Sequence, residues 1–225
     1  MKKLLFIALL ILLISCKKEQ AFISNMAKSD IDIITDIHAK NAKEYTKDLI
    51  IKLYKLNPKY LEKNDYFNNI SDVMTDIFKE VDHKTVDKTG QKNIDLILKG
   101  FDKKFNGDRI HLIGKGLYGM IHASYRYKEK FYLIDKRLDP QKLINSAINI
   151  ETLIWRLTNT RDNDELLIVT NTMEKNQVNL SFERLFGKLI QNQENISYII
   201  SAQEGRIVEK VTTGIVSSLF LPIGF

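Results

Sequence analysis

Residues 139–157, which read DPQKLINSAINIETLIWRL, carry the clearest helical pattern in the chain. Asp139 followed by Pro140 is typical of a helix start, because aspartate accepts hydrogen bonds from first-turn amides and proline fits that turn. Behind this start, apolar residues recur at steps of four, three, four and three, which is the spacing of one buried helix face. They are Leu143, Ala147, Ile150, Ile154 and Leu157. This stretch predicts a long helix packed into a core.

The same spacing recurs on both sides of this helix and predicts an all-α fold. The further expected helices cover residues 42–56, 70–81, 90–105, 108–127, 181–205 and 206–218. Two short apolar runs, Phe131–Ile134 and Leu166–Val169, have the length of strands and could pair with each other. We therefore expect a single bundle of six or seven helices, with room for one minor two-stranded hairpin.

The chain begins with a stretch that is typical of a secretory signal peptide. Lys2 and Lys3 precede an apolar run over residues 4–14, and the small residue Ser15 precedes Cys16. The run holds about eleven residues, or roughly 17 Å of helix, and spanning a bilayer takes about 20 residues. An ordinary signal peptide with an incidental cysteine remains the alternative to a lipoprotein leader. Cys16 is the only cysteine of the chain, and its position favours the lipoprotein.

Residues 13–16 (LISC) resemble the lipobox of bacterial lipoproteins. This resemblance implies that the leader is cut before Cys16 and that the Cys16 sulfur carries diacylglycerol, with fatty acids such as palmitate. It implies a signal peptide over residues 1–15, and a lipidated N-terminus and tether over residues 16–41 with room for a short helix. The helical globular domain then covers residues 42–225. Lys17, in place of an aspartate, implies the outer membrane facing the periplasm more than the inner membrane.

Two internal segments extend the resemblance to the mature chain. Residues 148–162 and 179–188, together with Phe220–Ile223, resemble predicted lipoproteins of Gram-negative bacteria that have no characterised function. This resemblance implies a lipid-anchored protein of the cell envelope and supplies no catalytic residue. Our leading hypothesis is that the domain acts through contacts with a protein partner or the membrane.

The charge of the chain argues against nucleic acid as a partner. Lysine and arginine number 34 and acidic residues 28, for a formal charge of +6, and loss of Lys2 and Lys3 with the leader lowers it to +4. The basic residues are scattered, and no block of five or six follows in sequence. We expect no nucleic-acid partner.

Residues 114–119 (GKGLYG) match the dinucleotide-binding pattern G-x-G-x-x-G through Gly114, Gly116 and Gly119. In that reading residues 109–113 form a strand, the glycines approach a pyrophosphate, and Asp135 binds the ribose. The same stretch also fits one continuous helix, in which the glycines allow another helix to pack closely. The shortage of further strands and an exported location favour the helix. A nucleotide-binding protein or enzyme remains the second hypothesis.

Other site chemistry is weakly indicated, and we expect neither a metal nor a cofactor. His111 and His122 are about 16 Å apart on one helix, too far to bind one metal ion. His38, with Asp32 and Asp36, has ligand atoms without the spacing of a known site.

The uncharged C-terminal run, residues 211–225, predicts either a last helix with its apolar end buried in the core or an exposed end that touches a membrane or partner. A third function hypothesis is a carrier that encloses a lipid or another hydrophobic ligand. An apolar cavity inside the bundle would favour it.

Overall fold

The computed structural model describes residues 28–81, 86–171, 173–174, 177–178, 180–205 and 219–223. Within these ranges the chain forms six α-helices, and its strands are limited to two pairs of two-residue strands. The prediction of an all-α bundle with minor strand structure is confirmed. The leader, Cys16 and the expected helix over residues 206–218 lie outside the described residues.

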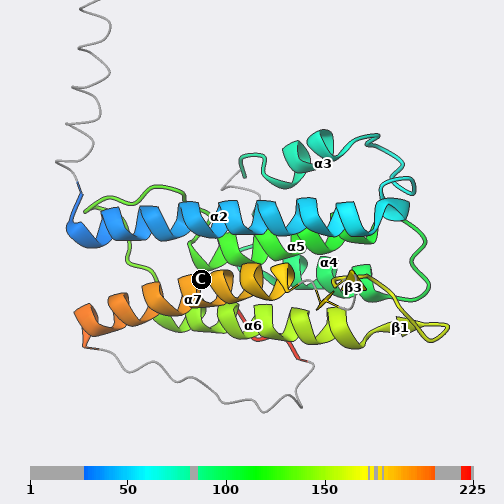
Figure 1. The fold of residues 1–225 in the computed structure, drawn as a ribbon. Coiled ribbons are helices and arrows are strands. Elements are labelled where there is room, and N and C mark those ends of the chain that lie inside the picture. Colours follow the sequence, from blue (N-terminus) through cyan, green and yellow to red (C-terminus); the bar gives the residue numbers. More distant parts are fainter. Residues whose placement is uncertain are drawn as a thin grey trace, which may run out of the picture.

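Four long helices form the body of the bundle and run side by side in Figure 1. They are α2 (Asp30–Leu56), α5 (Arg109–Ser124), α6 (Pro140–Asn159) and α7 (Ser181–Glu204). The shorter elements are the 3-10 turn η1 (Pro58–Tyr60), α3 (Ile70–Ile77) and α4 (Gln91–Phe101). α7 packs against both α6 and α2, and α5 packs against α4, α2, α6 and α3. α5 therefore packs against four of the other five helices.

α2 is one continuous helix and begins earlier than the sequence pattern suggested. Ser29 caps it in a capping box, in which the Ser29 hydroxyl accepts from the Asp32 amide and the Asp32 carboxylate accepts from the Ser29 amide. The expected boundary between a tether and a domain at residues 41–42 is therefore wrong, because α2 passes through it. The buried face at this point consists of small side chains, which are Thr35, Ala39, Ala42 and Thr46. Such residues are weak signals in an apolar pattern, although they allow helices to approach closely.

α6 confirms the expectation for residues 139–157. The Asp139 side chain accepts a hydrogen bond from the Gln141 amide at 3.0 Å, and Pro140 occupies the first turn. Leu143, Ala147, Ile150 and Leu157 are buried, and Ile154 is partly buried against the same core.

The predicted pairing of Phe131–Ile134 with Leu166–Val169 is wrong. Residues 131–134 contain no strand, and their chain turns at Tyr132–Asp135. The pairs that form are β1 (Arg161–Asp162) with β2 (Glu165–Leu166), and β3 (Met173–Glu174) with β4 (Gln177–Val178). Each pair joins neighbouring residues, so it needs no distant partner.

Leu167 and Ile168 are buried and Val169 is partly buried, and side chains take the place of a partner strand on their backbone. The Asn57 amide donates to the Val169 carbonyl and accepts from the Val169 amide, both at 2.8 Å. The Tyr60 hydroxyl donates to the Leu167 carbonyl at 2.5 Å. The residues that directly follow α2 thus replace the expected strand in binding this apolar run.

The described part of the C-terminal run, residues 219–223, lies against α6. The Asn149 side chain accepts from the Leu221 amide at 2.6 Å and donates to the Leu221 carbonyl at 2.9 Å. Asn145 donates to the Pro222 carbonyl at 2.8 Å, and Ile223 is 0% exposed within the core. The Arg156 guanidinium lies 5.5 Å from the centre of the Phe220 ring. The apolar end is therefore buried at Ile223, as one of the two predictions for this run expected.

Candidate functional site

The three motif glycines lie inside α5 and serve helix packing. A Cβ at Gly116 would lie 2.5 Å from the backbone oxygen of Asn93 in α4, and a Cβ at Gly114 would lie 2.9 Å from Ile50 Cδ1 in α2. A Cβ at Gly119 would collide with the Asn93 side chain. These glycines therefore allow α4 and α2 to pack closely against α5.

This arrangement corrects the dinucleotide-binding hypothesis. Residues 109–113 are helical, so no strand leads into a glycine turn. A phosphate cradle needs backbone amides that are free at a helix N-terminus, whereas amides inside a helix donate to carbonyls of the preceding turn. Asp135 lies in the turn after α5, where it accepts from the Tyr132 amide and pairs with Lys128. The three glycines are helical, Asp135 closes a turn, and residues 109–135 do not form a strand–turn–helix unit.

The histidines and their neighbouring carboxylates have separate structural partners. The His38 ring nitrogen lies 3.1 Å from the Asn192 carbonyl, and Asp36 accepts from the Phe131 amide at 2.8 Å. The His122 ring stacks on Tyr118 at 5.1 Å between ring centres. Among the residues that the structure describes, no group of three or more histidine, cysteine or acidic side chains is arranged to hold a metal ion.

Asp76 of α3 is the centre of the largest ion-pair cluster in the described structure. Its carboxylate lies 2.7 Å from the Lys115 ammonium, 2.8 Å from the Lys79 ammonium and 2.8 Å from His111 Nε2. Burial alone would raise the pKa of Asp76, but hydrogen bonds from Lys115, Lys79 and His111 outweigh it and hold the pKa well below its ordinary value. Lys115 and His111 belong to α5, so this cluster attaches α3 to α5.

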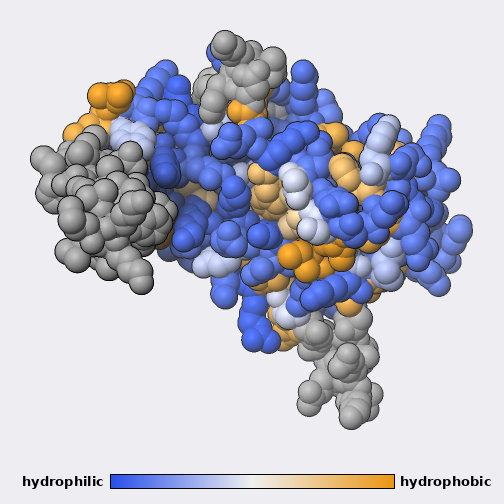
Figure 2. All heavy atoms as spheres, turned by 90° about the horizontal axis from the view of Figure 1, so that it is seen from above, coloured by the Kyte–Doolittle hydropathy of each residue, from blue (hydrophilic) through white to orange (hydrophobic). Residues whose placement is uncertain are grey.

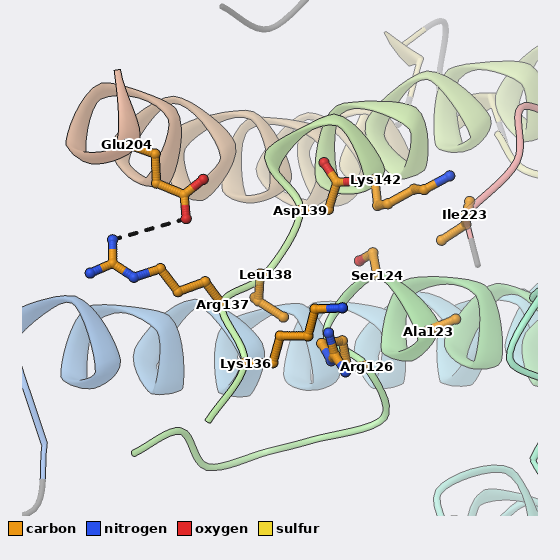
Figure 3. Close-up of a pocket in the computed structure, with 10 residues that line it drawn as sticks. All are labelled: Ala123, Ser124, Arg126, Lys136, Arg137, Leu138, Asp139, Lys142, Glu204 and Ile223. Carbon is orange, nitrogen blue, oxygen red and sulfur yellow. Dashed lines mark ion pairs between the residues drawn. The ribbon is translucent and has the colours of Figure 1, made fainter. Parts of the chain in front are cut away.

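A pocket of about 580 Å³ lies at the end of the bundle where α5 ends, α6 begins and α7 ends (Figure 3). Its volume is in the range of small-molecule sites, about 300–1,000 Å³. Ala123 and Ser124 line it from α5, Glu204 from α7, and Ile223 from the C-terminal segment. Because these elements are far apart in sequence, only the folded bundle forms the pocket.

Basic side chains dominate the charge of this pocket. Arg126, Lys136, Arg137 and Lys142 line it, against the two acids Asp139 and Glu204. Asp139 caps α6, and Glu204 Oε1 lies 3.9 Å from Arg137 Nη1, the pair that Figure 3 joins with a dashed line. Neither Lys136 nor Lys142 forms an ion pair within the described ranges. The pocket is suited to an anionic group.

The backbone after α5 directs Arg126 to this pocket. Arg126 and Tyr127 both have φ of 57°, a left-handed conformation that costs free energy for residues other than glycine. The Tyr127 amide donates to the His122 carbonyl at 2.7 Å and closes the end of α5. The Tyr127 hydroxyl contacts Asn93 at 2.9 Å and donates to the Asp87 carbonyl at 3.0 Å. These bonds hold the sharp turn that carries Arg126.

A buried polar network lies behind the pocket and joins the long helices. The Tyr125 hydroxyl donates to Gln193 Oε1 at 2.7 Å, and Gln193 Nε2 donates to the hydroxyls of Ser146 at 2.6 Å and Ser124 at 3.2 Å. Asn192 donates to the His38 carbonyl of α2 at 2.9 Å. Ser124 also donates to the Ile121 carbonyl at 2.7 Å, so its hydroxyl serves the network.

Sequence reasoning missed the basic lining, because it used the scattered charges only to argue against a nucleic-acid partner. Residues 136–137 follow an aliphatic pair, Leu133–Ile134, and this adjacency was the available signal. The Arg156 guanidinium lies outside this pocket, over the Phe220 ring of the C-terminal segment. Cys16, the predicted lipid site, lies outside the described residues.

A second surface pocket, of about 220 Å³, lies between α6 and α7 and is lined mainly by apolar side chains such as Ile154, Phe182 and Ile190. It is smaller than most sites that enclose a ligand. Figure 2 shows one face of the molecule, which is largely hydrophilic with scattered hydrophobic groups.

Comparison of the chain with known protein families, curated proteins and solved structures gives no match. No helix in the described ranges combines the length and the apolar character needed to cross a membrane.

Proposed function

We propose that this protein is a lipid-anchored protein of the cell envelope and that its helical domain acts through contacts with the membrane or a partner. The observation that carries this proposal is the position of Cys16, the only cysteine, at the end of an apolar leader with a lipobox-like ending. Two or three acyl chains on one residue anchor a protein firmly, because each buried methylene contributes about 0.8 kcal/mol.

The roles of the other candidate residues support contact over catalysis. The motif glycines pack helices, Asp135 closes a turn, and Asp76 holds α3 on α5. The basic pocket offers charge for binding. Ser124 is the one hydroxyl residue among the described residues that line this pocket. Its hydroxyl donates to the Ile121 carbonyl and is therefore not paired with a base that would make it a nucleophile.

A carrier for a hydrophobic ligand has less support. The core positions along α2, α5 and α6 are filled by side chains such as Ile50, Leu117 and Leu153, each at most 1% exposed. The apolar pocket between α6 and α7 is small and lies at the surface.

The test is incorporation of a fatty acid in cells. Cells that produce the full chain are grown with an alkyne-labelled palmitate, and the protein is purified and examined for label. We expect label on the native chain and on a Lys17→Ala control, which keeps the cysteine, and none on Cys16→Ala. Equal label on Cys16→Ala and the native chain would refute the anchor. Separation of inner and outer membranes from the same cells tests the predicted outer-membrane location.

A further inference from the structure

We propose that one end of the bundle docks on the surface of an anionic membrane, with Leu133 and Ile134 entering the lipid and Lys136 and Arg137 contacting lipid phosphates. This proposal rests on the proposed function, because the lipid on Cys16 brings that end to the membrane. We call it the anchor-side end, and it comprises the first turns of α2, residues 126–139 and the last turns of α7. In Figure 1, α2 begins and α7 ends at this end of the bundle.

The first observation is an exposed aliphatic turn. The Asp135 amide donates to the Tyr132 carbonyl at 2.8 Å, and the Asp135 carboxylate accepts from the Tyr132 amide at 3.0 Å. These bonds leave Leu133 and Ile134 at the tip, 64% and 95% exposed. Ile134 is the most exposed large hydrophobic residue in the described structure. The transfer of two adjacent aliphatic side chains from water into an apolar phase lowers the free energy.

The turn is held in place and cannot easily fold its tip inward. Phe131, directly before it, is buried in the core, and its amide donates to Asp36 of α2 at 2.8 Å. Asp135, directly after the tip, pairs with Lys128. Thr35 of α2, Leu138 and Ile200 of α7 line one small pocket, so these three elements meet at this end. The aliphatic tip is therefore presented by a fixed base.

The second observation is the place where the chain from Cys16 enters the domain. Lys28, the first described residue, pairs with Asp36, and its ammonium lies 4.5 Å from the centre of the Tyr132 ring. Eleven residues separate Cys16 from Lys28. A chain of that length reaches at most about 40 Å. A lipid on Cys16 thus keeps the turn close to the bilayer, where a weak contact acts at high effective concentration.

The third observation is charge complementarity. Residues 126–142 carry six basic and three acidic side chains. The basic ones are Arg126, Lys128, Lys130, Lys136, Arg137 and Lys142. Each basic residue near an anionic bilayer contributes about 1 kcal/mol, which corresponds to about fivefold in binding. Aliphatic residues flanked by lysine and arginine are the composition of a membrane-surface contact. A protein partner would need an acidic surface of its own that also accepts the two aliphatic side chains, whereas an anionic bilayer offers both properties.

The test uses a fluorescent label at the tip of the turn. Lipidation consumes the only thiol, so one introduced cysteine is labelled uniquely. The purified, lipidated full chain carrying Ile134→Cys is labelled with an environment-sensitive dye and placed in vesicles of equal parts phosphatidylcholine and phosphatidylglycerol. The control is Tyr66→Cys, which is 85% exposed in the native chain and follows the opposite end of α2. We expect a blue shift and several-fold stronger quenching by nitroxide-labelled lipid at residue 134 than at residue 66.

A second measurement removes the anchor from the experiment. The full chain with Cys16→Ser is tested for flotation with the same vesicles, with and without Leu133→Ser plus Ile134→Ser. We expect the double substitution to weaken binding about tenfold, because two aliphatic side chains no longer enter the lipid. We also expect high salt to weaken binding of the unsubstituted turn. Tyr66→Ser should leave binding unchanged.

The outcomes separate the docking from the anchor. Lipidated protein whose dye is as accessible to water at residue 134 as at residue 66 contradicts docking and leaves the anchor intact. A free thiol at Cys16 contradicts the anchor, and flotation of the Cys16→Ser chain then decides docking alone. A dye at residue 134 that nitroxide-labelled lipid does not quench overturns the membrane proposal and leaves a protein partner as the occupant of this turn.

Discussion

The middle of α5 and its C-terminal end differ in what surrounds them. The middle carries the glycines, and α4 and α2 approach its backbone closely at Gly116 and Gly114. The C-terminal end leads into two residues with positive φ, a basic pocket and an exposed aliphatic turn. The stretch that resembles a binding motif is thus used for packing, and an ordinary-looking charged segment forms the accessible surface.

The difference shows that spacing in sequence is weak evidence for a phosphate site. Glycine recurs both where a ligand approaches a backbone and where a second helix does, so only the surrounding secondary structure distinguishes the two. A binding surface built from single residues of α5, α6, α7 and the segment between α5 and α6 leaves no compact motif.

The largest effect is expected at the polar network that holds the C-terminal end of α5. Gln193→Ala removes the acceptor of the Tyr125 hydroxyl and the donor to Ser146, and it leaves a void at a residue that is 0% exposed. We expect the free energy of unfolding to fall by about 2–4 kcal/mol. The control is Gln191→Ala on the exposed side of α7, which should change it by less than about 0.5 kcal/mol. Chemical denaturation of both variants measures this, and equal small losses would mean that the network does not hold this end.

The next effect concerns the glycine part of α5. Gly116→Ala places a Cβ 2.5 Å from the Asn93 backbone oxygen, so α4 must move away. We expect a loss of about 1–3 kcal/mol in the free energy of unfolding, from overpacking. Gly187→Ala in α7 is the matched control, because a Cβ there meets nothing within 4 Å. Because alanine has a higher helix propensity than glycine, this control should raise the free energy of unfolding by as much as about 1 kcal/mol. If both substitutions stabilise the protein, the claim that the glycines of α5 serve close helix packing is contradicted.

A smaller, pH-dependent effect is expected where α3 attaches to α5. The folded-state pKa of Asp76 lies below its ordinary value of 3.8, so the unfolded chain takes up a proton at higher pH than the folded chain. The ion pairs therefore stabilise the fold fully above about pH 4, and this contribution is lost as the pH falls below that value. We expect Asp76→Asn to cost about 0.5–1 kcal/mol at neutral pH, since partners such as Lys79 are exposed.

The measurement for Asp76 is denaturation of both proteins at neutral pH and near pH 3. The difference between the native chain and Asp76→Asn should shrink at the lower pH. Asp95→Asn, at an exposed carboxylate on α4, is the control. A difference that stays constant with pH would mean that the Asp76 charge does not hold α3.

Much of the fold could be predicted from the sequence, because most of its helices carry complete local signals. Asp139 and Pro140 start α6, Asp108 caps α5, and Gly205 ends α7 in a left-handed conformation, as their residue types lead one to expect. The continuity of α2 was missed because Ala39 and Ala42 form its buried face with little hydrophobic signal.

The wrong strand prediction and the missed basic pocket have the same cause, because tertiary contacts determine both. Phe131 is buried and Ile134 is exposed, and nothing local distinguishes the two apolar residues. Residues 166–169 have the apolar character of a strand, yet the Asn57 side chain, more than a hundred residues earlier, binds the Val169 backbone. The basic pocket likewise needs Lys136, Lys142 and Glu204 to meet in space.

The most direct test of the anchor is mass spectrometry of the N-terminus of the protein isolated from membranes. We expect a mature chain that begins at Cys16, with a mass increase that corresponds to a diacylglyceryl group and fatty acid. A peptide that spans Ser15 and Cys16 intact, with an unmodified thiol, would contradict the lipid anchor.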